Sequence, residues 1–385
     1  MSKFKVCVVT GSRSEYHLQK RVIRFLQADP DIELQVVATG MHLSPEFGQT
    51  VQEIEADGLP VTDQVEMLLS SDTSVGVIKS VGLGCIGFAD TFSRLSPDVV
   101  MGLGDRFEWF AAAQAAFFSR IPIVHIAGGD VTQGAFDDAI RHSVTKMASL
   151  HLVTNALSRE RVIQLGEDPA LVYNVGHPGL DGLRDLNLLR GDELARQLGF
   201  AFQKRNLLVT YHPPTAGAAD AVAEFQALLN ALGRLEPDVG VVFTRPNADP
   251  GGRRLSQMVD DYVRGNSRAA VYTSLGQLLY FSLVNCVDAV VGNSSSGICE
   301  VPSLKKPTVD IGERQKGRMR GASVIHCNPL TDDLPAAIQR AWEMDCSNLV
   351  NPYGDGMSSP RIVTALKHHL TVGFVMSKRF FEVGK

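Results

Sequence analysis

The chain has no excess of positive charge and no long apolar run. Its 385 residues carry 37 lysines and arginines against 42 aspartates and glutamates, for a formal net charge of -5. This balance argues against nucleic acid or an anionic membrane as the main partner, because both favour strongly basic surfaces. No apolar stretch approaches the roughly 18 residues that a membrane helix needs, and the chain passes from its first residues directly into a strand pattern. We therefore expect a cytoplasmic protein.

Closely spaced cysteines and metal-binding motifs are also missing. The six cysteines are scattered without a CxxC pair, and no HExxH or comparable spacing occurs. We therefore expect neither a disulfide framework nor a metal site. The length exceeds the size at which one hydrophobic core keeps growing, which favours two domains.

Short runs rich in valine and isoleucine recur along the whole chain, separated by segments with helical periodicity. The runs are continuous rather than alternating, which is typical of strands buried on both faces of a parallel sheet. The sequence therefore predicts an α/β protein in two halves that join near residues 175–205. The runs are residues 4–11, 33–40, 97–105, 121–129, 150–155 and 171–179 in the first half, and 206–214, 239–247, 269–274, 286–293, 306–312 and 322–328 in the second.

The stretch VVGNSSSGICE, residues 290–300, places three serines between two glycines where an apolar strand gives way to a helix. Backbone N–H groups at a helix start, a glycine turn and short hydroxyls together favour an anion such as phosphate. An ordinary helix cap is the alternative, but one serine would suffice for it. We expect Glu300 on the first turn of this helix, where a carboxylate would bind hydroxyls rather than phosphate.

GLGCIG, residues 82–87, matches the GxGxxG pattern of dinucleotide-binding loops. That fingerprint requires a strand directly before it, and the preceding residues show no buried-strand pattern. Small residues on a closely packed helix explain the motif better.

Basic residues and histidines follow several of the predicted strands, where ligands bind in open parallel sheets. Arg13 in TGSRSEY offers a planar fork for phosphate or carboxylate, although a structural ion pair is an equal alternative. A second basic cluster, including Arg314, lies in IGERQKGRMRG, with surface solvation as its alternative. His212 in YHPPT is the histidine that we most expect to contact a ligand, followed by His42, His142 and His177.

Carboxylates also gather at strand ends. Asp105 and Asp130 follow apolar runs, and FDDAIRHSVTK places Asp137 at a helix start. Helix capping is the alternative for each. Asp137 and Arg141 are four residues apart, as are Asp138 and His142, so each pair shares a helix face. This pattern predicts an acid/base centre beside an anion clamp.

An ordered set of motifs over nearly the whole chain resembles the hydrolysing UDP-N-acetylglucosamine 2-epimerases, including bacterial enzymes that start sialic-acid and legionaminic-acid synthesis. The set is TGSRSEY, GMHLSPEFG, GLGDRFE, HIAGGDVTQGAFDDAIRHSVTK, NVGHPGLD, YHPPT, GNSSSGICEVPSL and GERQKGR. The resemblance implies two Rossmann-like domains in a GT-B-like arrangement, with the active site in the interdomain cleft. It places residues 1–178 and a returning helix at 366–385 on the sugar side, and residues 179–365 on the nucleotide side. A homodimer or homotetramer is expected.

The resemblance also implies roles for matching residues. Asp105, Asp137 and Asp130 are expected in proton transfer, although some members carry a glutamate where this chain has Ala127. The substrate-binding set is Arg13, His42, Arg106, His212, Asn247, Ser294, Ser295, Gly297, Glu300 and Arg314. The implied reaction eliminates UDP across C1 and C2 of the sugar and then adds water, with no metal or redox cofactor.

Three other functions share parts of this pattern. A non-hydrolysing 2-epimerase would re-add UDP, but its usual first motif resembles GTRPE, from which GSRSEY differs. A GT-B glycosyltransferase would need an acceptor. A two-lobed protein that closes on a nucleotide sugar without chemistry is the option outside the enzymes, and the strand-end carboxylates argue against it.

Overall fold

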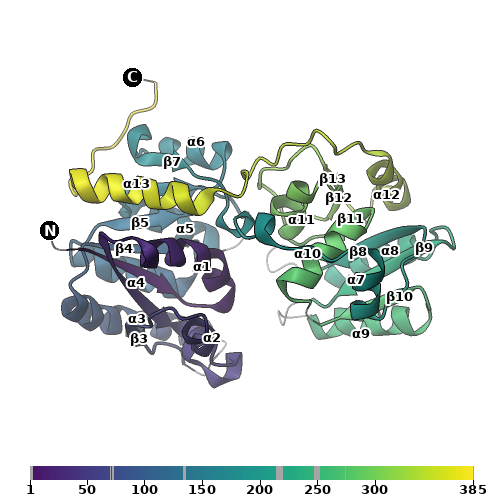
Figure 1. Ribbon diagram of the computed structural model, residues 1–385, viewed down its shortest axis with the longest axis horizontal. Helices are drawn as coiled ribbons and strands as arrows, with labels where there is room; N and C mark the ends of the chain where they lie inside the picture. Colours follow the sequence, from purple (N-terminus) through teal and green to yellow (C-terminus); the bar gives the residue numbers. More distant parts are fainter. Residues whose placement is uncertain are drawn as a thin grey trace. The chain divides into compact units, whose positions relative to one another are not determined.

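The protein is described by a computed structural model that covers residues 3–69, 71, 73–132, 136–213, 220–246, 252–273 and 275–384. Its contacts divide these residues into two compact units (Figure 1). The first unit is built from Met1–Asp130, Phe136–Gly182 and Tyr353–Lys385, and the second mainly from Leu183–Pro352. Each unit contains one parallel sheet covered by helices on both faces.

The first unit has a seven-stranded sheet with the order β3-β2-β1-β4-β5-β6-β7. Every neighbouring pair is parallel. The order reverses between β1 and β4, so the chain leaves these two adjacent strands in opposite directions. The strands are β1 (Phe4–Thr10), β2 (Ile32–Thr39), β3 (Asp63–Val65), β4 (Val99–Leu103), β5 (Ile123–Ile126), β6 (Leu150–Val153) and β7 (Val172–Asn174).

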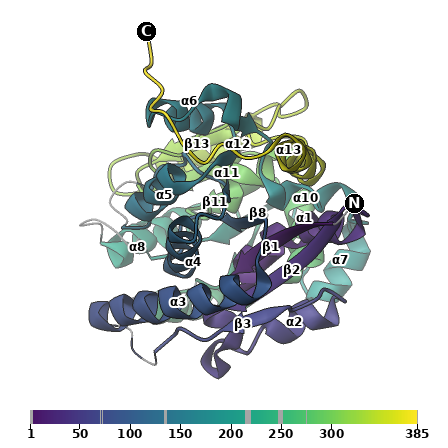
Figure 2. The same cartoon turned by 90° about the vertical axis from the view of Figure 1, so that its left-hand side faces the viewer.

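Two apolar layers hold helices against this sheet. One layer joins the sheet to α1 and α13, and the other joins it to α3, α4 and α5 (Figure 2). The α-helices of the unit are α1 (Arg13–Ala28), α2 (Val51–Ala56), α3 (Ser74–Leu95), α4 (Phe107–Phe118), α5 (Phe136–Met147), α6 (Ala156–Gln164) and α13 (Ser358–Val372). The 3-10 helices are η1 (Gly40–Leu43), η2 (Pro45–Phe47), η3 (Pro169–Leu171) and η4 (Pro178–Leu180).

The second unit repeats the plan with six parallel strands in the order β10-β9-β8-β11-β12-β13. The order reverses between β8 and β11. Helices α8, α9 and α12 share one apolar layer with the sheet, and α7 and α10 share the other. The strands are β8 (Arg205–Thr210), β9 (Val239–Thr244), β10 (Ala269–Tyr272), β11 (Ala289–Gly292), β12 (Thr308–Ile311) and β13 (Val324–Cys327). The helices are η5 (Leu183–Asp185), α7 (Gly191–Leu198), α8 (Ala221–Leu232), α9 (Gly252–Arg264), α10 (Gly276–Cys286), α11 (Ser296–Cys299), η6 (Val301–Leu304) and α12 (Leu334–Glu343).

The last helix returns to the first unit and is anchored there at its start. Asp181, whose side chain is buried, accepts hydrogen bonds from the backbone N–H groups of Ser358, at 2.8 Å, and Ser359. The N–H of His177 donates to the carbonyl of Tyr353 at 2.7 Å. The segments on either side of the second unit are therefore bonded to each other within the first unit.

Helix α3 corrects one expectation from the sequence. Among the described residues, α3 is the one helix whose length and composition match a membrane span, with a mean hydropathy of 1.4 over an 18-residue window. Glycines and serines interrupt its apolar residues, so the sequence shows no continuous run. A helix inside a globular fold meets the same measure, and α3 packs along α4 and β3. An alanine-like Cβ on Gly84 would lie 2.9 Å from the Cβ of Ala111 on α4, which confirms that small residues of GLGCIG allow close packing.

Candidate active site

The carboxyl ends of β1 and β4 lie at the point where the strand order of the first sheet reverses, which is where open parallel sheets bind ligands. Glu108, at the start of α4, is fully buried there. A Cβ on Gly11 would lie 2.9 Å from the Cβ of Glu108, and one on Gly40 would lie 2.7 Å from its Cγ. The loops after β1 and β2 therefore carry glycine because the Glu108 side chain fills the space between them.

Arg106 neutralises this buried carboxylate with two hydrogen bonds. Its Nε and one terminal nitrogen donate to the two Glu108 carboxylate oxygens, at 3.1 and 2.8 Å. A bidentate pair of this kind is strong and fixes the planes of both groups. Because its side chain is 35% exposed, Arg106 can also face a ligand.

Glu15 is a second buried carboxylate at this sheet edge. It accepts hydrogen bonds from the Gly11 N–H at 3.0 Å and the Ser12 hydroxyl at 3.1 Å, while Ser12 caps α1. Burial, followed by the nearby Glu108 carboxylate, raises the pKa of Glu15 to about 7. SRSE thus has the S-x-x-E spacing of a capping box, but Glu15 bonds to the N–H of Gly11 rather than of Ser12, and it lies beside Glu108.

Asp105 and Asp137 form the centre of the predicted acid/base group. Arg141, whose side chain is 3% exposed, donates to the Asp105 carboxylate and to Asp138 at 3.0 Å. Burial, followed by the charge of Asp105, raises the pKa of Asp137, while Arg106 and Arg141 oppose the shift. Two neighbouring carboxyls, one ion-paired and one that holds its proton more readily, are suited to dividing the base and acid roles.

Asp130 follows β5 and faces the start of α6. Its Oδ1 accepts from the Ser158 hydroxyl at 2.5 Å and from Thr154 and Asn155 at 3.3 Å each. Its backbone carbonyl accepts from Arg141 at 2.7 Å. Asp130 therefore joins the Asp105 group through Arg141, and its own carboxylate is held by hydroxyl and amide donors.

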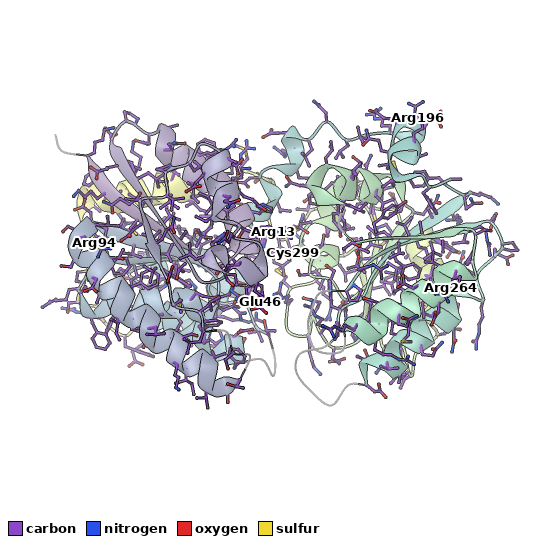
Figure 3. All side chains as sticks on the ribbon, turned by 90° about the horizontal axis from the view of Figure 1, so that it is seen from below. Arg13, Glu46, Arg94, Arg196, Arg264 and Cys299 are labelled. Carbon is purple, nitrogen blue, oxygen red and sulfur yellow. The ribbon has the colours of Figure 1, made fainter. Side chains whose placement is uncertain are left out.

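The two remaining residues predicted in the first unit are placed very differently. Arg13 is the first residue of α1 and is exposed (Figure 3). His42 is 0% exposed, and its ring nitrogens are hydrogen-bonded to the hydroxyls of Thr10 at 3.0 Å and Thr50 at 2.8 Å. Burial lowers the pKa of His42 to about 4. The structure therefore places His42 in the interior between two loops, with both ring nitrogens bonded to hydroxyls.

In the second unit, the equivalent reversal point lies after β8 and β11. Asn293 joins the two strand ends: its side-chain oxygen accepts from the His212 N–H at 2.7 Å, and its amide donates to the His212 carbonyl at 2.8 Å. The preceding residue, Gly292, has φ of 140°, and a Cβ there would lie 1.9 Å from the Thr210 carbonyl oxygen. Only glycine allows β11 to end this close to β8.

The serines after β11 take different partners. Tyr280 donates its hydroxyl to Ser296 at 2.9 Å, and Ser294 accepts from the Ser296 N–H at 3.3 Å. Ser295 is the N-cap residue of α11, but its side chain makes no capping bond, and it is partly exposed. Gly297 is buried against Thr308, whose methyl would lie 2.7 Å from a Cβ at that position. Ser295 thus has a hydroxyl suited to an external anion at a helix start.

Glu300 ends α11 instead of lying on its first turn, because the helix is only four residues long. Burial raises the pKa of Glu300, and a hydrogen bond with Ser296 opposes that shift. Burial and Glu300 also raise the pKa of Tyr280. Glu300 and Tyr280 on either side of Ser296 both lose their protons less readily than usual. This arrangement is suited to binding the hydroxyl groups of a ligand.

Arg314 lies after β12 and brings positive charge to the same loop. Its guanidinium donates to the Asn293 carbonyl at 3.1 Å, as does the amide of the buried Gln315 at 2.9 Å. Burial, followed by the charge of Arg314, lowers the pKa of His212 to about 4. His212 is thus a neutral donor or acceptor near neutral pH. Asn247 lies outside the described residues.

Several functional candidates were missed from the sequence. Glu108, Glu15, Asn293, Tyr280 and Gln315 lie in or beside the two groups. Glu15, Glu108, Asn293 and Gln315 lie inside quoted motifs, and the glycines in those motifs are the sequence signal that could have marked them. Among the described residues, no group of three or more His, Cys, Asp and Glu side chains is arranged to hold a metal ion.

Together, the two units indicate a class of enzyme, a two-domain α/β protein. Carboxylates follow the strands at the reversal point of the first sheet, and hydroxyl, amide and guanidinium groups follow those of the second sheet. The fold is that of a putative UDP-N-acetylglucosamine 2-epimerase from Listeria monocytogenes, with a TM-score of 0.81 at 18% identity, covering 100% of both chains. A UDP-GlcNAc 2-epimerase from Neisseria meningitidis bound to UDP-GlcNAc has a TM-score of 0.73 at 20% identity, covering 95% of this chain and 100% of the other. The predicted two-domain Rossmann-like fold of the GT-B type is therefore confirmed.

The chain belongs to the UDP-N-acetylglucosamine 2-epimerase family, whose model matches residues 24–367. It is 38% identical to the GDP/UDP-N,N'-diacetylbacillosamine 2-epimerase (hydrolyzing) of Campylobacter jejuni, covering 88% of each chain. It is 32% identical to the UDP-N,N'-diacetylbacillosamine 2-epimerase (hydrolyzing) of Legionella pneumophila, covering 94% of this chain and 95% of the relative. The family predicted from the motifs is confirmed.

Proposed function

We propose that this protein is a hydrolysing nucleotide-sugar 2-epimerase, which converts a UDP-linked 2-acetamido sugar and water into UDP and the free 2-epimeric sugar. The observation that carries the proposal is the Asp105 and Asp137 pair, in which one carboxylate is ion-paired to Arg141 and the other has a raised pKa. Relatives at 38% and 32% identity are named as hydrolysing 2-epimerases, which supports the same reaction.

In the first step, a carboxylate takes the proton from C2 while the C1–O bond to the diphosphate breaks. UDP leaves with the bonding electrons, and the sugar becomes a glycal with a C1=C2 double bond. The second carboxyl, which is protonated, then donates its proton to C2 from the opposite face while the hydroxyl of water adds to C1. The remaining proton of the water restores that second carboxyl, and the first carboxyl releases the C2 proton to solvent. We assign these proton transfers to Asp105 and Asp137, with Asp130 as a third candidate.

The leaving diphosphate requires donors and positive charge when the C1–O bond breaks. We assign Ser294, Ser295, Arg314 and His212 to the diphosphate, together with Arg13. Glu300 is assigned to the ribose hydroxyls, and Gly297 to the close approach of the helix start. Asn247 and Arg106 complete the proposed substrate-binding set. We propose the first unit as the sugar-side domain and the second as the nucleotide-side domain. The expected bounds of 1–178 with 366–385, and 179–365, need correction, because the returning helix is Ser358–Val372 and the first unit includes residues up to Gly182 and from Tyr353 onward.

A proton NMR time course in deuterated water tests the reaction. Purified protein is incubated with UDP-N-acetylglucosamine, and separately with UDP-2,4-diacetamido-2,4,6-trideoxyglucose, without metal or acceptor. The expected result is free UDP and a free manno-configured sugar that carries deuterium at C2. An intact epimeric nucleotide sugar would indicate the non-hydrolysing reaction, and UDP release only with an added acceptor would indicate a glycosyltransferase. No change in either donor would favour a binding protein.

We further propose a cytoplasmic homodimer or homotetramer that supplies sialic-acid or legionaminic-acid synthesis and needs no nucleic acid or membrane partner. Helix α3 offers a surface for a second copy, because Val75, Ile78 and Ile86 are 58%, 70% and 66% exposed along it. Light scattering after size-exclusion chromatography tests the assembly. An Ile78→Lys, Ile86→Lys variant should shift the protein towards the monomer, whereas an unchanged mass would exclude this surface.

A further inference from the structure

The segment that follows α13, residues 374–384, runs across the first unit to the end of α6 and is called the strap below (Figure 1). The N–H of Phe381 donates to the carbonyl of Gly166, just after α6, at 2.9 Å. Gly166 has φ of 87°, and a Cβ there would lie 2.4 Å from the ring of Phe380. Glycine at this position therefore lets the strap dock through a backbone hydrogen bond and a ring contact.

Lys378, in the middle of the strap, places its ammonium group at the end of α5. It donates to the backbone carbonyls of Lys146 at 2.9 Å and Ala148 at 2.7 Å. Helix α5 ends at Met147, and the last carbonyls of a helix have no partner within that helix. A cation is also favourable at this end, where the helix dipole is negative. Lys378 therefore caps α5 from a distant part of the chain.

A buried carboxylate holds this ammonium group in place. The side chain of Glu167 is 1% exposed, and its carboxylate lies 2.5 Å from the Nζ of Lys378. It also lies 2.6 Å from the Nζ of Lys146 and 2.9 Å from the Nε2 of His151. Burial acts to raise the pKa of Glu167, but hydrogen bonds from these three partners lower it to about 2. Loss of Lys378 would therefore leave a buried, charged carboxylate with fewer partners.

Helix α5 also carries part of the proposed acid/base group, with Asp137 in its first turn and Arg141 one turn later. The buried side chains of α5 are Arg141, Val144 and Thr145, and Val144 is the apolar one among them. Polar contacts at the two ends of α5 therefore contribute to fixing its position. A helix moves as a rod, and a displacement of about 1 Å at reacting groups can cost about 100-fold in turnover.

We propose that the strap fixes the position of α5, and that Lys378 is a positioning residue for Asp137 and Arg141 on that helix. Lys378 acts through the helix end and is assigned no contact with the substrate. This inference rests on the proposed function, because that function assigns Asp137 to proton transfer. It gives the segment after α13 a part in the reaction, although the strap bonds to the opposite end of α5 from Asp137.

Hydrogen exchange of the α5 amides tests the strap, and steady-state kinetics test its effect on the reaction. Lys378→Met should speed exchange at residues 144–148 by about 10-fold or more, while the amides of β1 and β4 keep their protection. With whichever UDP-sugar donor is turned over, kcat should fall by about 10-fold and KM should stay within about 2-fold. Lys378→Arg should bring both measurements back to within about 3-fold of the wild type, because arginine keeps the charge.

Arg379→Met is the matched control, because Arg379 is the exposed next residue and its loss should change either measurement by less than about 2-fold. Phe380→Ala is a second variant that loosens the same strap at a side chain that is 65% exposed and keeps the partners of Glu167. It should speed exchange at the same amides and lower kcat, and it replaces Lys378→Met if that variant does not fold.

Unchanged exchange in α5, or equal acceleration in β1 and β4, would overturn the role of the strap. Faster exchange in α5 with an unchanged kcat, or a loss of turnover that Lys378→Arg does not restore, would overturn the positioning role of Lys378. If the wild-type protein turns over neither donor, the proposed function fails. The exchange measurements then still decide whether the strap holds α5.

Discussion

The two units share a doubly wound parallel plan but place different chemistry at the point where the strand order reverses. In the first unit, buried carboxylates dominate, and arginines partly neutralise them. In the second, the groups are serine hydroxyls, the neutral imidazole of His212 and the guanidinium of Arg314. The same doubly wound plan therefore carries the groups that we propose for proton transfer in one unit and those that we propose for anion binding in the other.

The largest expected effect is on turnover and concerns the first unit alone. Asp105→Asn and Asp137→Asn should each lower kcat by about 10²- to 10⁴-fold, because an amide cannot exchange the required proton. The affinity for UDP, measured by calorimetry, should stay within about 2-fold, since our assignment places neither aspartate on the diphosphate. Asp192→Asn, at an exposed position in α7, is the matched control. Near-normal turnover of both variants would remove the acid/base assignment.

The second prediction concerns the stability of the second unit at the end of β11. Gly292→Ala should destabilise the protein by about 3 kcal/mol, because a Cβ would overlap the Thr210 carbonyl at an unfavourable φ. Gly199→Ala is the control, since Gly199 also has positive φ but has no neighbouring atom within 4 Å of the added Cβ. Urea unfolding followed by circular dichroism should show a loss of only about 1 kcal/mol there. Equal losses would mean that the contact with Thr210 contributes nothing.

Loss of charge in the proposed anion-binding group of the second unit should change the affinity for UDP, whereas loss of the carboxylates should change turnover. Arg314→Gln should weaken UDP binding by about 10- to 100-fold, the usual scale for a hydrogen bond to a charged group. Lys316→Gln, an exposed neighbour that pairs with Glu313, should change it by less than about 2-fold. Calorimetric titration with UDP measures both, and equal affinities of the two variants would exclude Arg314 from the diphosphate.

A last effect is a pH dependence of stability due to Glu15. Its folded pKa of about 7 lies above the ordinary glutamate value of 4.5, so its contribution to stability is fully present below pH 4.5 and is lost as the pH rises through 7. Glu15→Gln keeps acceptors for Gly11 and Ser12 but cannot ionise. The free energy of unfolding of the wild type should therefore fall relative to the variant between pH 4.5 and 7. Parallel pH profiles would show that Glu15 does not titrate in this range.

Most of the fold could be predicted because parallel strands buried on both faces are continuous apolar runs. All six runs in the second half of the chain overlap observed strands, and so do all six in the first half. Among the described residues, β3 is the one strand that no run predicted. This strand is three residues long, lies at the edge of its sheet and begins with Asp63 and Gln64. A polar edge strand of that length has no hydrophobic signal of its own.

The candidate site was less predictable, because the partners of its residues come from distant segments. His42 follows a strand, as a ligand-binding residue would, but Thr10 and Thr50 hold it in the interior. The spacing showed that Arg141 shares a helix face with Asp137, but it could not show that Arg141 also bonds to Asp105 from another loop. Periodicity shows which residues share a helix face, whereas these contacts depend on how loops meet in three dimensions.

The bonding of Asp181 to the start of α13 has a consequence for the order in which the protein folds during synthesis. Helix α13 contributes Ile362, Leu366 and Leu370 to the core of the first unit, yet the ribosome makes it after residues 183–352. The unit that begins the chain therefore cannot complete its core until the other unit has been translated. The second unit, whose residues emerge as one nearly continuous segment, is free to reach its native structure first.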